Sequence, residues 1–294
     1  MNNRLTLFKQ WLETSDIPFA FITSTENVFH LSGFHSDPHE RLLALAIFPH
    51  AEPILICPKM EASDAKNAGW EYDIIGYTDV EDPWEMIQQA VGERNIRATK
   101  IAIEKEHLNV ERYEKIQTHF EEPALVSAEE KLRQLRMIKD EKELSIIREA
   151  CKLADFAIEI GVNEITEGKT EMDVLAAIEY ELKRKGINEM AFSTMVLTGK
   201  NAASPHGTPG LTKIQKGDLI LFDLGVVYEG YCSDITRTVA YYDINDKQKE
   251  IYDTVLQAQL AAIEASKPGA LCKDLDLAAR NYIASKGYGE YFPH

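Results

Sequence analysis

The sequence predicts two domains, an α/β domain over residues 1–125 and an α+β domain over residues 126–294. The 294 residues correspond to about two domains of ordinary size. In the first part, short apolar runs alternate with helical patterns, as in an α/β domain whose sheet is covered by helices. After Pro123 the pattern changes to a charge-rich helical stretch, then strands, then helices, which indicates a second domain. We expect the boundary near residues 122–130, with residues 131–140 as the alternative connector.

In the first domain, the predicted strands are short apolar runs bounded by turn-forming residues. The N-terminal segment has apolar side chains at helical spacing, which predicts a helix. Asp82-Pro83 is typical of a helix start, because proline is tolerated at the first helical position. We expect strands at 19–23, 42–48, 53–57, 72–76 and 100–103, and helices near 60–68, 82–94 and 109–120.

The second domain is predicted to begin with helices. Residues 128–160 are helical in pattern, with a stripe of apolar residues three or four positions apart. Thr170 and Asp173 resemble a capping box at the start of a helix that ends at Gly186. We expect strands near 190–198, 219–227 and 232–242, followed by helices near 246–266 and 271–286.

Composition argues against several classes of function. The formal net charge is −16 and no basic cluster is visible, which argues against a nucleic-acid partner and an anionic membrane surface. No run approaches the roughly 18–20 apolar residues of a membrane span, and the N-terminus lacks a signal-peptide pattern. The cysteines form no CxxC pair, so we expect reduced thiols in a cytoplasmic protein. No GxGxxG or P-loop motif indicates a nucleotide site.

Two aspartates lie in predicted strands within the stretch from Asp218 to Tyr242. Asp223 is inside a strand so apolar that at least one of its faces is expected to be covered. A carboxylate there needs a partner, because an unpaired buried charge is strongly unfavourable or shifts its pKa until it is neutral. Asp234 follows in a second predicted strand, and residues 228–230 between the strands predict a tight hairpin turn.

The register of this hairpin decides how the two aspartates are placed. A turn centred on Tyr228 and Glu229 puts them directly opposite each other, and one centred on Glu229 and Gly230 makes them diagonal neighbours on one face. A three-residue loop or a bulge would put them on opposite faces. Facing carboxylates repel, so we expect a cation between them; oxygen ligands suit Mg²⁺ or Mn²⁺ and also fit a two-metal site. The alternative is that Asp223 caps a loop or pairs with an arginine such as Arg237.

His206 lies in the polar segment 201–207, a loop that contains proline and glycine and follows a predicted strand. A loop histidine can move a proton or hold an anionic group. The alternative is an ordinary solvated loop residue. None of the other histidines pairs with a cysteine or serine motif.

FDLG at 222–225, followed by CSDITRT at 232–238, is similar to the paired-aspartate motif of the pita-bread metallopeptidases. That family includes Xaa-Pro dipeptidases (prolidases) and aminopeptidase P. SPHG at 204–207 is similar to the family's loop that supplies a substrate-side histidine. KDEKELSIIREACKLAD at 139–155 resembles the helix that opens the catalytic domain. NVFHLSGF at 27–34 resembles a signature of the N-terminal domain, with histidine in place of the usual aromatic residue.

The resemblance implies a fold and an activity. The fold is a creatinase/prolidase-like α/β domain over residues 1–125 and an α+β pita-bread catalytic domain over residues 126–294. The activity is hydrolysis of Xaa-Pro peptide bonds in small peptides with proline at the second position. Asp223 and Asp234 are implied to be ligands of two divalent metal ions, Mn²⁺ first, with Co²⁺ or Zn²⁺ as alternatives. His206 is implied to contact the substrate, and the protein to be a homodimer.

The chain departs from the family pattern at its C-terminal end. Besides the two aspartates, the family's metal site uses a histidine from a His-Gly-x-Gly element and two glutamates. The sequence ends at His294, which matches a histidine shortly before that ligand and is implied to bind substrate or move protons. We therefore expect three ligands beyond residue 294, a catalytic domain that is incomplete at its C-terminus, and no activity from residues 1–294 alone.

Two other functions stay open at this point. Pita-bread domains can lose their metal and act as binding modules, in which case the aspartate pair would be inherited but idle. The chain can also be a pita-bread aminopeptidase that does not require proline. Comparing the hydrolysis of Xaa-Pro and Xaa-Ala dipeptides distinguishes the latter from a prolidase.

Overall fold

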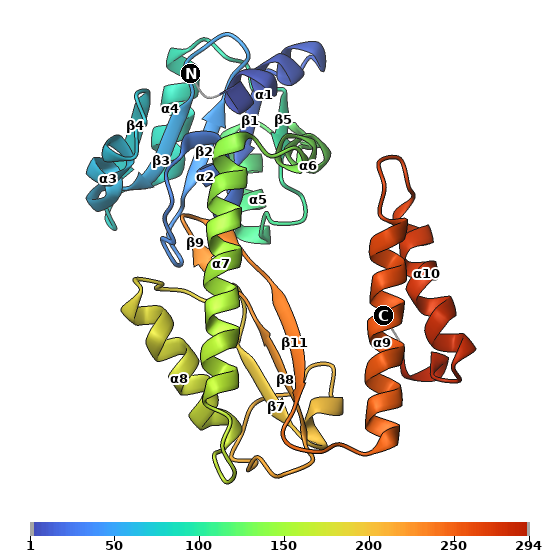
Figure 1. Ribbon diagram of the computed structural model, residues 1–294. Coiled ribbons are helices and arrows are strands. Elements are labelled where there is room, and N and C mark those ends of the chain that lie inside the picture. The colour runs from blue at the N-terminus through green and yellow to red at the C-terminus, as the bar shows by residue number, and fades with distance from the viewer. Residues whose placement is uncertain (1–2, 293–294) are drawn as a thin grey trace. The chain divides into compact units, whose positions relative to one another are not determined.

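The computed structural model describes residues 3–292 and divides into two compact units, Met1–Asp140 and Glu141–His294 (Figure 1). The division lies beyond the expected 125/126 boundary and falls at the end of the alternative connector, residues 131–140. The reason is that β6 (Ala124–Ser127) pairs with the last strand of the first sheet, and α6 (Glu129–Met137) packs its Leu132 into the first unit's core. The long helix that follows belongs to the second unit.

The first unit is built on a six-stranded sheet with the strand order β4-β3-β2-β1-β5-β6. Strand β2 runs antiparallel to both neighbours, and the other pairs are parallel. The predicted strands and helices are confirmed to within a few residues, whereas α2 and β6 were not predicted. The remaining elements are α1 (Asn3–Thr14), β1 (Phe19–Ile22), α2 (Thr25–Ser32), β2 (Ala44–Ile47), β3 (Ile54–Pro58), η1 (Lys59–Glu61), α3 (Ala62–Asn67), β4 (Asp73–Tyr77), α4 (Pro83–Glu93), β5 (Lys100–Ile103) and α5 (Val110–His119).

The core of the first unit lies on both faces of this sheet. Strands β1, β2 and β3 are buried along their whole length, which explains their continuous apolar sequences. Helices α1, α2 and α6 cover one face, and α4 and α5 cover the other. The predicted covered α/β sheet is thus confirmed.

A buried carboxylate ties the sheet of the first unit to α2. Glu104 follows β5 and accepts hydrogen bonds from the backbone N–H groups of Thr23 at 2.7 Å and Ser24 at 2.8 Å. The side-chain amide of Asn27 donates to it at 2.6 Å. Ser24 also caps α2, so the negative charge lies where the N–H groups of the helix start are unpaired.

The described part of the second unit combines four α-helices with a three-stranded antiparallel sheet in the order β11-β8-β7 and a two-stranded sheet of β9 and β10. The helical pattern at 128–160 is divided between α6 and α7, because Ile138 takes an extended backbone conformation. The elements are α7 (Glu141–Asn163), α8 (Glu171–Arg184), β7 (Met195–Thr198), η2 (Asn201–Ala203), β8 (Leu219–Leu224), β9 (Val227–Tyr228), β10 (Tyr231–Cys232), β11 (Ile235–Ala240), α9 (Asp246–Ala265), α10 (Cys272–Ser285) and η3 (Gly289–Tyr291).

Small residues allow α7 to pack closely on the sheet. The buried face of this helix contains Ala150, Ala154, Ala157 and Gly161. A Cβ atom added at Gly161 would lie 2.6 Å from Phe222 Cε1 and 2.9 Å from Ile178 Cδ1. Such distances are too short for any real Cβ contact. Gly161 therefore makes room for Phe222, the neighbour of Asp223 on β8.

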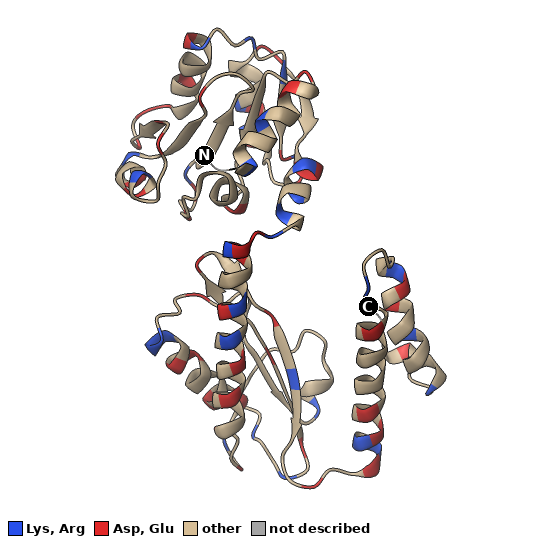
Figure 2. Cartoon of the chain, turned by 45° about the horizontal axis from the view of Figure 1, so that its top comes forward, with Lys and Arg blue, Asp and Glu red and all other residues tan. Residues whose placement is uncertain are grey.

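Helix α9 exposes a row of large apolar side chains: Ile251, Tyr252, Val255, Leu256, Leu260 and Ile263. Exposed apolar rows of this kind are typical of surfaces that contact another part of a protein or a partner. Basic and acidic residues are interspersed along the helices (Figure 2). Within residues 3–292, no helix is long and apolar enough to cross a membrane.

The close packing of α7 gives a matched pair of glycine substitutions. We expect Gly161→Ala to lower the free energy of unfolding of the second unit by about 1–3 kcal/mol, because the new methyl group overpacks Phe222. Gly92→Ala is the control, since Gly92 lies in α4 with open space around it. It should raise the stability of the first unit by about 0.5–1 kcal/mol. Denaturant unfolding measures both; a Gly161→Ala variant as stable as the parent contradicts the close contact.

Candidate metal centre and histidine loop

The hairpin that contains both aspartates turns at Glu229 and Gly230. Both residues have positive φ angles, 46° and 79°, as a two-residue type I′ turn requires. Tyr228 pairs with Tyr231 next to the turn, and Asp223 pairs with Thr236 farther along. The structure therefore adopts the second of the two registers considered from the sequence.

In this register Asp223 and Asp234 are diagonal neighbours rather than a directly opposed pair. Asp234 lies two residues before Thr236, the partner of Asp223, so the hairpin brings the two carboxylates to one region. The chain there is not regular, because Ser233 and Asp234 fall between β10 and β11. The sequence prediction that the hairpin brings the two aspartates together is supported by this pairing.

A close approach between the hairpin's two arms fixes this irregular segment. A Cβ atom added at Gly225 would lie 1.9 Å from the backbone oxygen of Ser233, so only glycine fits at position 225. The backbone N–H of Val226 donates to Ser233 Oγ at 3.1 Å, and the N–H of Ser233 donates to Val226 O at 3.0 Å. Asp234 therefore follows directly from a rigidly held residue.

The electrostatics of the pair are those of two like charges held together. Asp223 is partly buried, and Asp234 is exposed. Burial raises the pKa of Asp223, and the negative charge of Asp234 raises it further. A hydrogen bond of 3.1 Å from Thr236 Oγ1 acts in the opposite direction and lowers it. The net pKa is above the ordinary value, so the site favours a bound proton or another cation.

The alternative partner of Asp223, Arg237, does not contact it. The guanidinium of Arg237 donates to the backbone oxygen of Thr236 at 2.8 Å. Neighbouring residues on a strand point to opposite faces, so Arg237 and Thr236 are directed to different sides of β11. The idea that Asp223 pairs with Arg237 is therefore wrong.

The aspartate pair fits part of a divalent-cation site. Carboxylate oxygens are the ligands that hard divalent cations prefer. Within residues 3–292, no group of three or more His, Cys, Asp or Glu side chains is arranged to hold a metal ion. The described chain thus offers two carboxylates at this hairpin, and a complete metal site would need further ligands.

His206 lies in a loop of residues 199–209, which is the first part of the connection between β7 and β8. The backbone N–H of Gly207 donates to Ser204 O at 3.2 Å, which forms a tight turn with His206 inside it. The side chain of His206 is exposed. Gly207 is buried, and a Cβ atom there would lie 2.7 Å from Leu197 Cδ1. The loop is therefore seated on β7 with the histidine outward. The other candidate histidine, His294, lies outside the described residues.

Sequence reasoning missed one residue that bears on this loop. Glu171 is a fully buried carboxylate that binds the loop at both ends. Its position after Thr170, at a helix start, made it look like an ordinary acidic residue of the first helical turn. Nothing in the spacing along the chain shows that its partners are 27 and 39 residues away.

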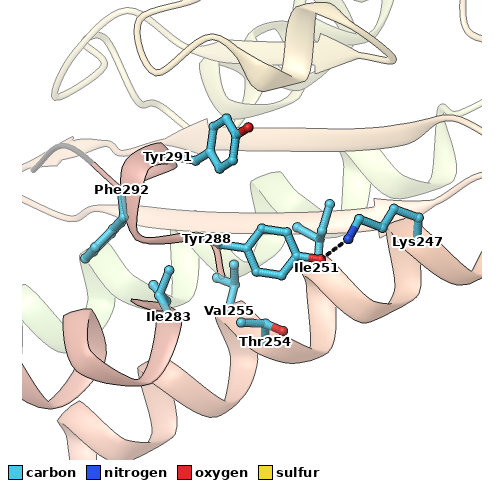
Figure 3. A pocket seen from close by; sticks show the side chains of 8 residues that line it. All are labelled: Lys247, Ile251, Thr254, Val255, Ile283, Tyr288, Tyr291 and Phe292. Atoms are coloured by element: carbon cyan, nitrogen blue, oxygen red, sulfur yellow. Dashed lines mark hydrogen bonds between the residues drawn. The ribbon is translucent and has the colours of Figure 1, made fainter. Parts of the chain in front are cut away.

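A cavity of about 400 Å³ between α9 and α10 is a different feature from the aspartate pair (Figure 3). Apolar and aromatic side chains line it, among them Val255, Ile283 and Phe292. Lys247 donates a hydrogen bond to the hydroxyl of Tyr288, as the dashed line in Figure 3 shows. Among residues 3–292, the side chains that line the cavity include no histidine and no carboxylate pair, so the described lining offers no set of hydrolytic groups.

The aspartate pair leads to a prediction for the metal-free protein. Because the pKa of Asp223 is raised, the folded state binds more protons than the unfolded chain between the ordinary and the raised pKa, and stability falls as pH rises through that window. In a chelating buffer at pH 7, Asp223→Asn should therefore raise the free energy of unfolding, and this gain should shrink at acidic pH, where the parent is protonated. Asp253→Asn, at an exposed site on α9, should change neither the free energy of unfolding nor its dependence on pH. A destabilised Asp223→Asn variant at pH 7 contradicts the like-charge account.

Both parts of the chain match known protein families. Residues 4–138 match the creatinase/prolidase N-terminal domain, and residues 145–294 match metallopeptidase family M24. YkvY of Bacillus subtilis, a provisionally assigned dipeptidase, is 53% identical over 99% of this chain and 80% of its own length.

Solved structures show the same relationship. The prolidase from Pyrococcus horikoshii OT3 superposes with a TM-score of 0.90 at 34% identity, over 100% of this chain and 80% of that one. An Xaa-Pro dipeptidase from Bacillus anthracis gives a TM-score of 0.90 at 28% identity, over 99% and 79%. Both domains are matched, and one relative is more than half identical over 99% of this chain. The chain therefore belongs to metallopeptidase family M24, with a creatinase/prolidase N-terminal domain and a pita-bread catalytic domain.

Proposed function

We propose that the full-length protein is an Xaa-Pro dipeptidase that depends on two divalent metal ions. One observation carries this proposal: in a chain of family M24, a hairpin holds Asp223 beside Asp234, and the pKa of Asp223 is raised. The similar solved structures include a prolidase and an Xaa-Pro dipeptidase, which supports the choice of substrate. Aminopeptidase P activity on longer peptides is the nearest variant of the same chemistry.

Asp223 and Asp234 would hold the metal ions together with a histidine and two glutamates beyond residue 294. We propose Mn²⁺ first, because carboxylates favour hard cations, with Co²⁺ or Zn²⁺ as substitutes. When bound, such ions activate water as a nucleophile near neutral pH and polarise the scissile carbonyl. The two aspartates would hold the ions and offset their charge, and their mutual repulsion would be relieved by the bound cations.

His206 would act on the substrate. Its exposed imidazole on a tightly turned loop can donate a hydrogen bond to the carbonyl oxygen that becomes negative during attack. We propose a similar substrate contact or proton transfer for His294. Proline at the second position has no amide N–H, so a site shaped for its ring selects it by fit.

The setting of the protein is also part of the proposal. We propose a cytoplasmic homodimer that acts on small peptides. Residues 1–294 hold two of the five expected ligands, and the chain spans 80% of the Bacillus subtilis relative. We propose that these residues alone are inactive, because two carboxylates do not fix the catalytic geometry of two ions.

Dipeptide hydrolysis tests the activity. With Mn²⁺ added, the full-length protein should hydrolyse Xaa-Pro dipeptides with a kcat/KM at least about a hundredfold above that for Xaa-Ala, a ratio within the range that shape-based selection of substrates reaches. Residues 1–294 should give no Mn²⁺-dependent turnover. Equal rates on both dipeptides would instead favour an aminopeptidase without proline specificity.

Metal analysis of two variants tests the ligand assignment. Asp223→Asn and Asp234→Asn in the full-length protein should each lower the bound Mn²⁺ per chain and reduce kcat/KM by about a thousandfold, because each removes a charged ligand. Asp253→Asn serves as the control with unchanged metal content. Unchanged stoichiometry in both ligand variants refutes the assignment, and a parent that binds neither metal nor turns over substrate favours the binding-module alternative.

A further inference from the structure

Glu171 binds both ends of the loop that contains His206. It is the first residue of α8, and its side chain has no exposed surface. The backbone N–H of Thr198 donates to its Oε1 at 2.7 Å, and the N–H of Gly210 donates to Oε2 at 2.8 Å. The side-chain amide of Asn201 donates to both oxygens at 3.0 Å. One carboxylate thus joins the start and the end of the loop.

These contacts require an ionised carboxylate. All the partners are donors, so both oxygens must accept, which a glutamine side chain cannot do. Within residues 3–292 the partners of Glu171 are N–H groups rather than a lysine or an arginine. Glu171 is also in the first turn of α8, where the positive end of the helix dipole favours a negative charge. Hydrogen bonds to an ionised acceptor are roughly twice as strong as neutral ones, so the loop is held firmly.

The interior of the loop is fixed by the same contacts. Asn201, which Glu171 binds, also donates to the backbone oxygen of Thr208 at 3.3 Å. The backbone of α8 adds one more contact at the end of the loop, because the N–H of Met172 donates to Gly210 O at 3.2 Å. With Gly207 seated on β7, the loop has little freedom to shift around His206. A shift of the Glu171 carboxylate would therefore also shift His206.

We propose that Glu171 is a positioning residue whose carboxylate clasps the loop and fixes the orientation in which His206 meets the substrate. This inference rests on the proposed function, because the substrate contact of His206 is itself a proposal. The clasp does not include either aspartate. It therefore acts on the histidine side of the site and leaves metal binding unchanged.

Glu171→Gln in the full-length, Mn²⁺-loaded protein tests the clasp. The amide has the same shape but presents an N–H to a backbone N–H. Hydrogen exchange at the amides of Thr198 and Gly210 should become at least about tenfold faster, as expected when a local opening becomes easier. The value of kcat/KM should fall on the order of tenfold to a hundredfold, because a misplaced catalytic group lowers the rate by about this factor. The amount of bound Mn²⁺ should not change. Unchanged exchange at both amides overturns the clasp.

A double-mutant cycle with His206→Ala tests the route of action. If Glu171 acts through His206, Glu171→Gln should lower kcat/KM by no more than about twofold in the His206→Ala background, because the two sites are coupled. If the losses of kcat/KM caused by the two substitutions multiply in the double variant, the positioning role is overturned. A His206→Ala variant with the parent's kcat/KM would refute the proposed function of that histidine, and the exchange measurement would still decide whether the clasp exists.

Two further variants separate the clasp from general damage to the helix. Asp173→Asn weakens the capping box of the same helix, whose partner is Thr170, and leaves the loop contacts in place. It should leave kcat/KM and the exchange of the loop amides unchanged. Asn201→Ala removes the side-chain half of the clasp and should lower kcat/KM in the same direction as Glu171→Gln. An Asp173→Asn loss equal to that of Glu171→Gln would overturn the positioning role.

Discussion

Repulsion between two carboxylates on one hairpin is the constraint on which the second unit depends. Asp223 lies on β8 and Asp234 lies just before β11, and the turn at Glu229 and Gly230 makes them diagonal neighbours. Gly225 lets the two arms approach so closely that the segment has no freedom to separate the charges. A fold that maintains such a repulsion gains its stability elsewhere and presents a site where a cation is favoured.

The surrounding structure supplies that stability through close packing and buried carboxylates. The small residues of α7 lie against Phe222, next to Asp223, so the strand cannot relax away from the helix. Each unit also has a buried glutamate beside a helix start that binds backbone N–H groups: Glu104 beside α2 and Glu171 in α8. In both places a carboxylate holds a segment that regular secondary structure does not hold.

Much of the fold follows from local sequence patterns, and less of the site does. Continuous apolar runs predict the buried strands. Two elements are not predicted, because α2 is short and β6 is half exposed. The aspartate pair is predictable from spacing, whereas the choice between registers depends on which two residues accept positive φ angles. Glu171 is not predictable, because its partners come near only after the sheet has formed. The family resemblance supplies metal and substrate, which the residues alone leave open.

Anomalous diffraction at the manganese edge, from crystals of the full-length protein grown with Mn²⁺, tests the metal assignment most directly. The account predicts two peaks about 3.5–4 Å apart, as in other two-metal sites. Carboxylate oxygens of both Asp223 and Asp234 should lie within bonding distance of them. Peaks elsewhere in the chain, or a hairpin with neither aspartate bound to an ion at saturating Mn²⁺, would contradict the account.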